Sequence, residues 1–410
     1  MSVTTASRRP SRVNKVVTKE RLLGTESRWR RFGQPTPAGS SVVEEVIPDY
    51  GVFGPGSVAW DILLHPATIF FQTSVQAVLQ LAYKPIKAGV RDWDPISRKA
   101  RKGELTLFDV FDRTQRNSGI HTPMWLGDTS TARRVAKHLH NIHVKVAGDT
   151  IDVGQPKLGG YDANGPRDAM WAALTEMHSM LWLYEKLAFR DGKLPHRLPP
   201  EKRDQFMAEV ARYCRLFDSP EDEIPATMAE MAALYAKYDE MFQHSKTMNI
   251  IPATGEDLIK VAGRSIVKNF HPSQLRAIVP IALMNGLFAL PTLGAVSSKT
   301  RRSKGVGPVH DKLAIASTKV MLPLIWLVQQ PPVERYFMRL MWGPDAIRLI
   351  ESARELHRQA KAGHLPSTRA SAFRCPKGSH SDATRSWTSS PTQPTRPTRP
   401  TRPTRPTRPT

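Results

Sequence analysis

Cysteine is nearly absent from this 410-residue chain, which contains only Cys214 and Cys375. Two cysteines argue against a disulfide scaffold, and they cannot form a metal site without other ligands. Long alternation of apolar and polar residues is also missing, so no stretch argues for a β-sheet. What remains is apolar residues at helical spacing, and the expected fold class is all-α.

An apolar segment that could serve as an export signal is also missing. The N-terminus contains Arg8-Arg9, as twin-arginine signals do, but no apolar run follows before residues 25–33. A signal peptide needs that apolar run. We therefore expect a cytoplasmic protein without a signal peptide.

Positive charge is plentiful, with a formal net charge of +22, but it is concentrated at the two ends. Residues 1–32 carry a net +7 and residues 363–410 a net +8, which leaves +7 for the 330 residues between them. The tails can bind anionic lipid or nucleic acid without specificity. The chain contains no zinc finger and no glycine-rich phosphate loop, so we expect no specific nucleic-acid partner.

Composition divides the chain into three parts. Residues 1–40 are rich in Ser, Thr, Pro and Arg and are expected to be disordered. The same holds for residues 363–410, which end in a Pro-Thr-Arg repeat; a docking segment and a passenger tail are both open for it. Residues 41–362 are expected to form a single large helical domain, with apolar C-terminal helices over residues 257–362.

Several helices can be placed from their spacing. Residues 58–83 are strongly apolar, with a break predicted at His65-Pro66. Helices are also predicted over residues 201–217 and 226–242, the second opening with a capping box formed by Thr227 and Glu230. Two further apolar stripes follow helical periodicity: Leu107, Val110, Phe111 and Thr114; and Met170, Ala173, Leu174, Met177, Leu181 and Tyr184.

Residues 277–296 contain no charge and reach the length of a bilayer span, but Pro and Gly interrupt them. Residues 320–328 are apolar as well. The basic residues Lys299, Arg301, Arg302 and Lys304 lie between these runs. A broken core helix and a peripheral contact with an anionic membrane both remain open for this region.

A histidine lies on the apolar face of the helix predicted over residues 129–146. That face carries Ala132, Val135, Ala136, Leu139, Ile142 and Val146, and His143 shares it, whereas His138 and His140 fall on the wetter side. A buried imidazole needs a hydrogen-bond partner or a metal, because an unpaired polar group costs roughly 1–3 kcal/mol in a protein interior. A satisfied core histidine and a metal ligand are both open on this evidence alone.

Several short blocks resemble, in order and spacing, the MpaB-type oxygenase family, which includes the catalytic domain of the latex clearing protein (rubber oxygenase). The resemblance covers about residues 50–245. The blocks are Gly54-Pro55-Gly56-Ser57 with Trp60, Asp112-Arg113-Thr114, Gly127-Asp128, His143 with Gly148, Tyr161-Asp162-Ala163-Asn164, Trp171, His178-Ser179 and Glu185-Lys186.

The resemblance implies an all-α fold around a non-covalently held b-type haem. The proximal ligand of the family is a histidine about thirty residues after an Arg/Lys-Thr pair, and His143 lies 29 positions after Thr114. His143 is therefore the implied axial ligand of the haem iron. Arg113 and Thr114 are the implied distal and cofactor-binding pair, and His178, part of a His-Ser pair shared with related sequences, is placed near the pocket.

The residue type at position 113 limits what it can do. A guanidinium lacks an accessible lone pair, so Arg113 is expected to gate the iron or to polarise oxygen rather than to coordinate. The alternative is an ion pair with Asp109 or Asp112. The resemblance assigns no carboxylate as a general base, and Asp94 and Glu176 are the two candidates. The chain departs from the family at Lys84-Pro85, where His-Pro is common, and at Val110, where rubber oxygenases carry an arginine.

The leading functional hypothesis is thus a haem b-dependent oxygenase that uses dioxygen on a lipophilic small molecule, such as an isoprenoid chain. One alternative is a haem-binding sensor or carrier without catalytic turnover. A second is a membrane-associated helical protein without a cofactor.

Overall fold

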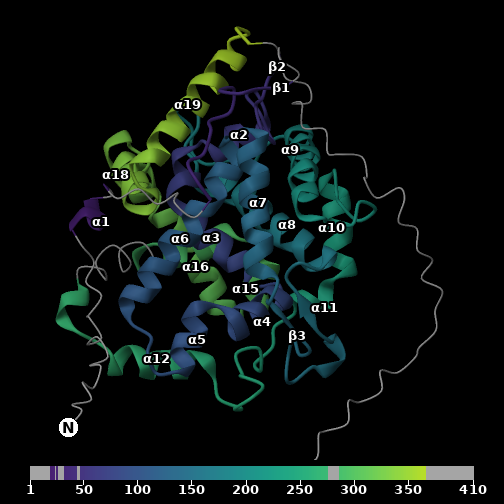
Figure 1. Cartoon of the computed structure of the whole chain (residues 1–410), viewed down its shortest axis with the longest axis vertical. Helices are drawn as coiled ribbons and strands as arrows, with labels where there is room; N and C mark the ends of the chain where they lie inside the picture. Colours follow the sequence, from purple (N-terminus) through teal and green to yellow (C-terminus); the bar gives the residue numbers. More distant parts are fainter. Residues whose placement is uncertain (1–18, 24, 26–31, 44–46, 276–285, 366–410) are drawn as a thin grey trace, which may run out of the picture. The chain divides into compact units, whose positions relative to one another are not determined.

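Helices dominate the chain, as the all-α prediction requires (Figure 1). The structure is a computed structural model that describes residues 19–23, 25, 32–43, 47–275 and 286–365. Within those ranges the only sheets are two short antiparallel pairs, β1 with β2 and β3 with β4. Most of the C-terminal tail predicted to be disordered lies outside the described residues. The N-terminal segment is described at residues 19–23, 25 and 32–40, which include α1 and the buried Ala38, so the prediction of disorder does not hold for that part. The division at residues 40 and 363 stays a prediction.

The first half of the chain contains the longest helices. Its elements are α1 (Lys19–Leu23), β1 (Val42–Val43), β2 (Ile47–Pro48), α2 (Val58–Leu63), α3 (Pro66–Gln80), α4 (Lys84–Trp93), α5 (Pro95–Arg101), α6 (Leu107–Leu126), α7 (Thr129–His143), β3 (Ala147–Gly148), η2 (Pro156–Leu158), β4 (Tyr161–Asp162) and α8 (Pro166–Leu187).

The second half is built of shorter helices. They are α9 (Pro200–Cys214), η3 (Arg215–Phe217), α10 (Met228–Lys237), α11 (Asp239–Phe242), α12 (Leu258–Lys268), η4 (Pro272–Gln274), α14 (Ala289–Ala295), α15 (Ser298–Ser303), α16 (Pro308–Val320), α17 (Leu322–Val328), α18 (Pro331–Trp342) and α19 (Pro344–Lys361).

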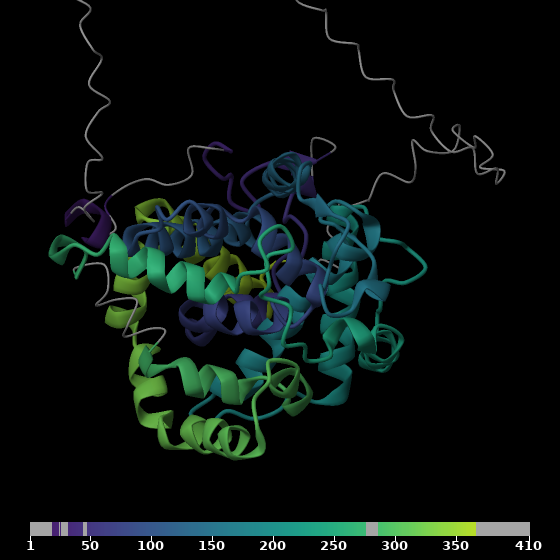
Figure 2. The same cartoon turned by 90° about the horizontal axis from the view of Figure 1, so that it is seen from below.

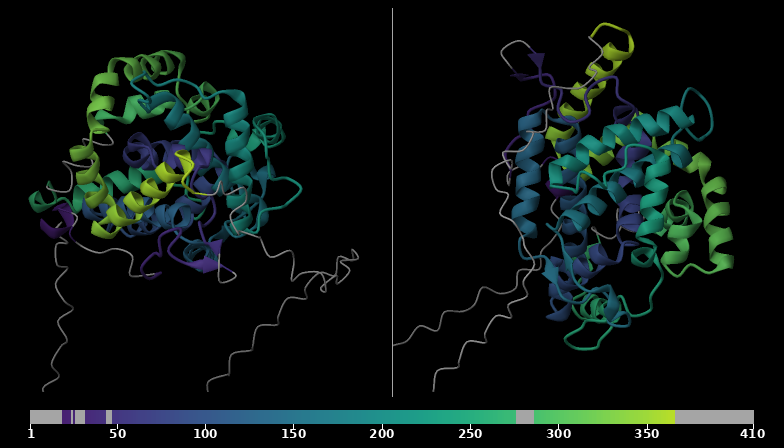
Figure 3. Two further views of the ribbon diagram at one scale, coloured as in Figure 1. Left: turned by 90° about the horizontal axis from the view of Figure 1, so that it is seen from above. Right: turned by 90° about the vertical axis from the view of Figure 1, so that its right-hand side faces the viewer.

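Helices α3 and α8 pack against each other at the centre of the fold. The antiparallel pair α6 and α7 lies on one side of them, and helices α14 to α17 lie on the other, as the views in Figures 2 and 3 agree. The stripe predicted for α8 is buried in full, including Leu174, Met177 and Leu181. Each such side chain contributes about 1.5–3 kcal/mol by leaving water, so this stripe fixes the position of α8.

The helix boundaries follow from local capping chemistry. The predicted break at His65-Pro66 is confirmed: the His65 side chain accepts from the Ala67 amide, and Pro66 opens α3. The capping box of Thr227 and Glu230 is present at the start of α10. Helix α6 begins with a second capping box, in which Thr106 and Asp109 each satisfy the backbone amide of the other.

The turn between α6 and α7 is held from several sides. Asp128 caps α7 by accepting from the Thr131 amide at 2.7 Å, and the Trp60 indole donates to the Trp125 carbonyl at 3.0 Å. Gly51, at φ +70°, lies so close to the Gly127 carbonyl that a side chain would collide with it. Two of the short sequence blocks, the one with Trp60 and Gly127-Asp128, therefore meet at the turn between α6 and α7.

The helical stripe of α7 is confirmed only in its first half. Ala132, Val135 and Ala136 are buried, but Ile142 is 51 % exposed, so its placement in the core was wrong. The reason is that α7 extends past its packing partners near its C-terminal end, which borders a cavity instead of the core.

No helix among the described residues is long and apolar enough to cross a membrane. Part of the apolar run at 277–296 lies outside the described residues, and the rest forms α14 and the turn before it. The second apolar run forms α17, with Pro323 in its first turn.

Candidate functional site

A cavity of about 1050 Å³ lies among helices α4, α6, α7 and α8. The start of α5, the turn η3 and the end of α18 complete its wall. This volume is at the upper end of what small-molecule and cofactor pockets reach. Small residues on the α8 wall, Ala169, Ala172 and Ala173, leave room between the helices.

Helix α6 contributes several polar residues to the cavity lining, and Arg113, Asn117 and His121 are three of them. They are spaced four residues apart, which places them on one face, roughly 12 Å from first to last at 1.5 Å rise per residue. Sequence reasoning identified Arg113 and missed the other two. The four-residue spacing was the signal that could have found them.

Arg113 is fixed by two partners. Its Nε donates to Asp94 Oδ2 at 2.8 Å, and its Nη1 donates to Asn117 Oδ1 at 3.0 Å. Asp94 is itself held, because its other oxygen accepts from the Ile96 amide at the start of α5. Arg113 therefore forms an ion pair, as the alternative predicted, but its partner is Asp94 instead of Asp109 or Asp112.

The two carboxylates named as that alternative are occupied elsewhere. Asp109 pairs with Lys99, and Asp112 pairs with Arg116 and Arg21. Neither therefore competes with Asp94 for the Arg113 guanidinium.

His143 closes the C-terminal end of α7 and borders the cavity. The pKa of His143 is lowered to about 4, mainly by burial and also by the positive charges of Arg113 and the two neighbouring histidines. The imidazole is therefore neutral at pH 7 and keeps a lone pair, which is the form that binds a metal. Among the described residues no hydrogen bond to the His143 ring is formed.

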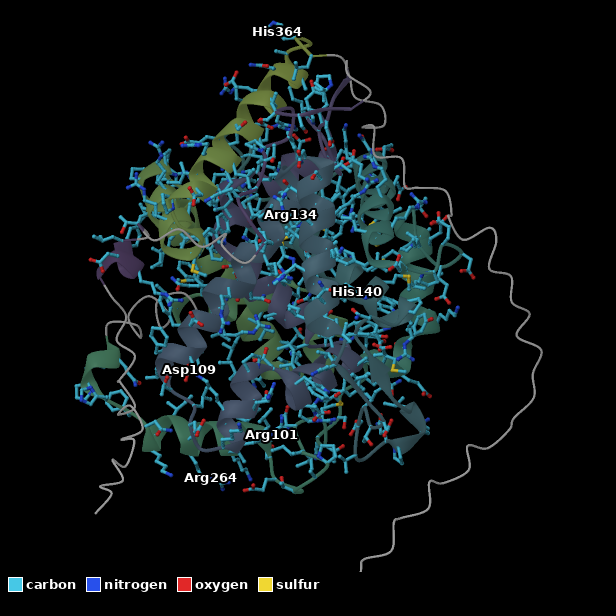
Figure 4. All side chains as sticks on the ribbon, in the orientation of Figure 1. Arg101, Asp109, Arg134, His140, Arg264 and His364 are labelled. Carbon is cyan, nitrogen blue, oxygen red and sulfur yellow. The ribbon has the colours of Figure 1, made fainter. Side chains whose placement is uncertain are left out.

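The other two histidines of α7 are not remote from the cavity, contrary to the expectation. His138 is half-buried, with its ring 5.8 Å from that of Phe32, and His140 is exposed, yet both border the cavity. Figure 4 labels His140 and Arg134 along α7. The side of α7 that was predicted to be exposed to solvent thus forms part of the cavity wall.

The far end of the cavity holds a buried pair, His121 and Glu176. The Nδ1 of His121 lies 3.0 Å from Glu176 Oε2, and the opposite oxygen accepts from the Trp125 indole and the Tyr213 hydroxyl, each at 2.9 Å. The Nε2 of His121 lies 3.3 Å from the Gln76 amide nitrogen. The carboxylate therefore lies beside Nδ1 without forming a hydrogen bond to it, and Gln76 is the hydrogen-bond neighbour of Nε2.

Two residues expected at the site lie elsewhere. The Thr114 hydroxyl donates to the Val110 carbonyl one turn back along α6, and its side chain does not line the cavity. His178 is buried on the opposite side of α8, where its Nδ1 is 3.2 Å from the Tyr235 hydroxyl and its ring packs on Trp182. The cavity residues of α8 lie at positions 168, 169, 172, 173 and 176.

Comparison with known proteins identifies one family. The model described as "ER-bound oxygenase mpaB/B'/Rubber oxygenase, catalytic domain" matches residues 60–315, more than half of the chain. That range contains Arg113, His121, His143 and both carboxylates that face them. No curated protein and no solved structure matches the chain.

Proposed function

Because this chain belongs to the mpaB/rubber oxygenase catalytic-domain family, we propose that it is a haem b-dependent oxygenase acting on an apolar substrate. The observation that carries the proposal is His143, whose neutral imidazole lines a large cavity together with the fixed Arg113. The family match supports oxygenase activity; the haem and the substrate class are our inference.

The residues around the cavity fit a haem. A haem needs one neutral imidazole for its iron and a mostly apolar cleft for its ring. His143 would hold the iron, and Ile86, Leu139 and Ala169 are among the apolar side chains that would contact the ring. Lys137 and Arg98 also line the cavity and would attract the carboxylates of the group.

When bound, haem would supply the iron at which dioxygen is activated. Arg113 carries a permanent positive charge and is held by Asp94 and Asn117, so it can present a fixed donor to a polar group in the cavity. Asp94 is a positioning residue in this account, since one of its oxygens binds Arg113 and the other caps α5.

His121 and Glu176 supply the second polar group of the cavity. An imidazole backed by a carboxylate is the usual arrangement of a proton acceptor in enzymes, because the carboxylate orients the ring and stabilises its charged form. His121 can accept a proton at Nε2, where Gln76 is its neighbour. We propose this pair, rather than Asp94, as the acid–base group of the site.

The substrate proposed is a lipophilic molecule, such as an isoprenoid chain with a carbon–carbon double bond. Apolar residues from α4, α7 and α18 line the cavity between its two polar ends, among them Ile86, Leu139 and Met341. Such a lining excludes water and favours an apolar ligand.

The test is the absorbance spectrum of the purified protein, oxidised and then reduced with carbon monoxide. We expect a Soret band that is lost in His143→Ala and retained in His138→Ala and His140→Ala. These are matched controls, because all three histidines border the cavity. Equal haem occupancy in the three variants would contradict the assignment of His143.

The same measurements separate the alternatives. A protein without any Soret band would be the membrane-associated helical protein without cofactor. A haem protein that forms no oxygen-dependent product with apolar alkenes would be a sensor or carrier.

A further inference from the structure

Helix α16 carries its apolar side chains on the outside. Val309, Leu313, Ala316 and Val320 fall within about 60° of one another at 3.6 residues per turn, so they form a single stripe. Val309 is 68 % exposed, Leu313 52 % and Val320 76 %. The opposite side of α16, with Ala314 and Thr318, is buried against α14.

The next helix extends this surface. Trp326 and Leu327 of α17 are each 49 % exposed, and α17 contacts α16. We name Val309, Leu313, Val320, Trp326 and Leu327 the α16–α17 face. Large exposed apolar side chains that recur at helical spacing on one surface indicate a partner, since solvent gives them no stabilisation.

The charges beside this face are positive. Lys312 and Lys319 are exposed, lie seven residues apart along one edge of the stripe, and form no ion pair within the described ranges. The sole acidic residue between positions 308 and 328 is Asp311, and the buried Arg301 neutralises it at 2.6 Å.

The four basic residues predicted to attract a membrane do not form one exposed cluster. Arg301 is buried, Lys299 pairs with Asp239, and half-buried Lys304 has a pKa lowered to about 8, mainly by burial. Arg302 is exposed, and Lys299 is exposed but paired. Electrostatic attraction at this region therefore has to come from Arg302, Lys312 and Lys319 more than from the other three basic residues.

We propose that the α16–α17 face binds the surface of an anionic lipid bilayer, with α16 lying in the interface. An apolar stripe bordered by lysines, with a tryptophan at its end, is typical of interfacial helices. The lysine stems can extend along the apolar surface while their ammonium groups reach the headgroups. A second copy fits less well, because a two-fold contact would bring like lysines together.

This surface is separate from the cavity. Helices α3 and α8 lie between α14–α17 and α7 (Figures 2 and 3), so the face does not form the mouth of the site. The proposal therefore does not rest on haem or on the oxygenase reaction, and it can fail while they hold.

The test is cosedimentation of the full-length protein with phosphatidylcholine vesicles, with and without phosphatidylserine. Replacing Leu313 and Trp326 with serine should lower the partition coefficient at least about tenfold, because two large apolar side chains leave the membrane. Replacing Lys312 and Lys319 with glutamate should reduce the preference for phosphatidylserine and the weakening by salt, since the basic tails remain. Amide hydrogen exchange over residues 308–328 should slow on vesicles.

The matched control replaces Ile259 and Val267 of α12 with serine. Both are exposed apolar residues, at 65 % and 78 %, on a different helix. This variant should bind vesicles as the unchanged protein does. Undiminished vesicle binding of the Leu313→Ser/Trp326→Ser variant would overturn the proposal and assign binding to the basic tails. If the unchanged protein is a dimer and this variant is a monomer, the face binds a second copy instead. Circular dichroism confirms that each variant is folded.

Discussion

His178 offers a sharp test of the packing around α8. Its ring is buried among the side chains of α8 and α10, and its Nε2 has no partner in the described part of the chain. The pKa of His178 is lowered to about 3, mainly by burial and also by the charge of Arg203. The folded protein therefore holds this imidazole neutral, whereas the unfolded chain protonates it near pH 6.5.

The sign of the pH effect follows from this difference. The folded pKa lies below the unfolded one, so the stability linked to His178 is complete above pH 6.5 and declines as pH falls toward about 3. Each pH unit in that window costs about 1.4 kcal/mol for one proton. Between pH 7.5 and pH 5 the loss due to His178 is about 2 kcal/mol, because only about 1.5 units lie below the unfolded pKa.

The assay is urea unfolding followed by circular dichroism at the two pH values. His178→Leu should lose about 2 kcal/mol less than the unchanged protein on acidification, whatever its stability at pH 7.5. The exposed His196 provides the control, since His196→Gln should leave the pH dependence unchanged. If His178→Leu and the unchanged protein lose equal stability, His178 is protonated in the fold and its placement against α10 is wrong.

Two further predictions concern the cavity. Arg113→Ala should retain haem but alter its spectrum and lower turnover by roughly 10²–10³-fold, because one preorganised charge is lost. Arg113→Lys, which cannot bind both Asp94 and Asn117 in the same way, should recover only part of the turnover. Unchanged spectra together with unchanged turnover would show that Arg113 forms only a structural ion pair. Glu176→Gln should cost about 2–3 kcal/mol in urea unfolding, because it replaces the buried carboxylate that accepts from Trp125 and Tyr213 and lies beside His121. Tyr213→Phe, which removes one donor to the same carboxylate, should cost about 1 kcal/mol. Equal costs would show that the contact between His121 and Glu176 does not stabilise the fold.

Periodicity predicted the elements whose packing depends on hydrophobicity alone. The stripe of α8 was predicted residue by residue, because a central helix buries its apolar face against α3 along its whole length. The break before α3 and the capping box of α10 were predicted from local chemistry, which needs no tertiary information. The same reasoning failed at Ile142, since periodicity does not say where a neighbouring helix ends.

The site was only partly predictable for a related reason. Residues on one helix can be grouped from spacing, and Arg113, Asn117 and His121 were open to that approach. The partners across the cavity could not be grouped in this way. Asp94 lies at the start of α5 and Glu176 lies on α8, and their contacts with Arg113 and His121 depend on how the helices cross. Thr114 illustrates the limit, since its hydroxyl binds its own helix instead of the cavity.

The two charged pairs of the cavity connect stability to function. Burying Asp94 beside Arg113, and Glu176 beside His121, takes charges out of water, and apolar residues of similar volume often stabilise a fold as well or better. Both pairs border the same cavity, roughly 12 Å apart along α6. Stability alone does not explain two buried carboxylates, each beside a basic side chain, in the wall of one cavity. Their placement is explained if one end serves the cofactor beside His143 and the other handles protons for a lipophilic substrate.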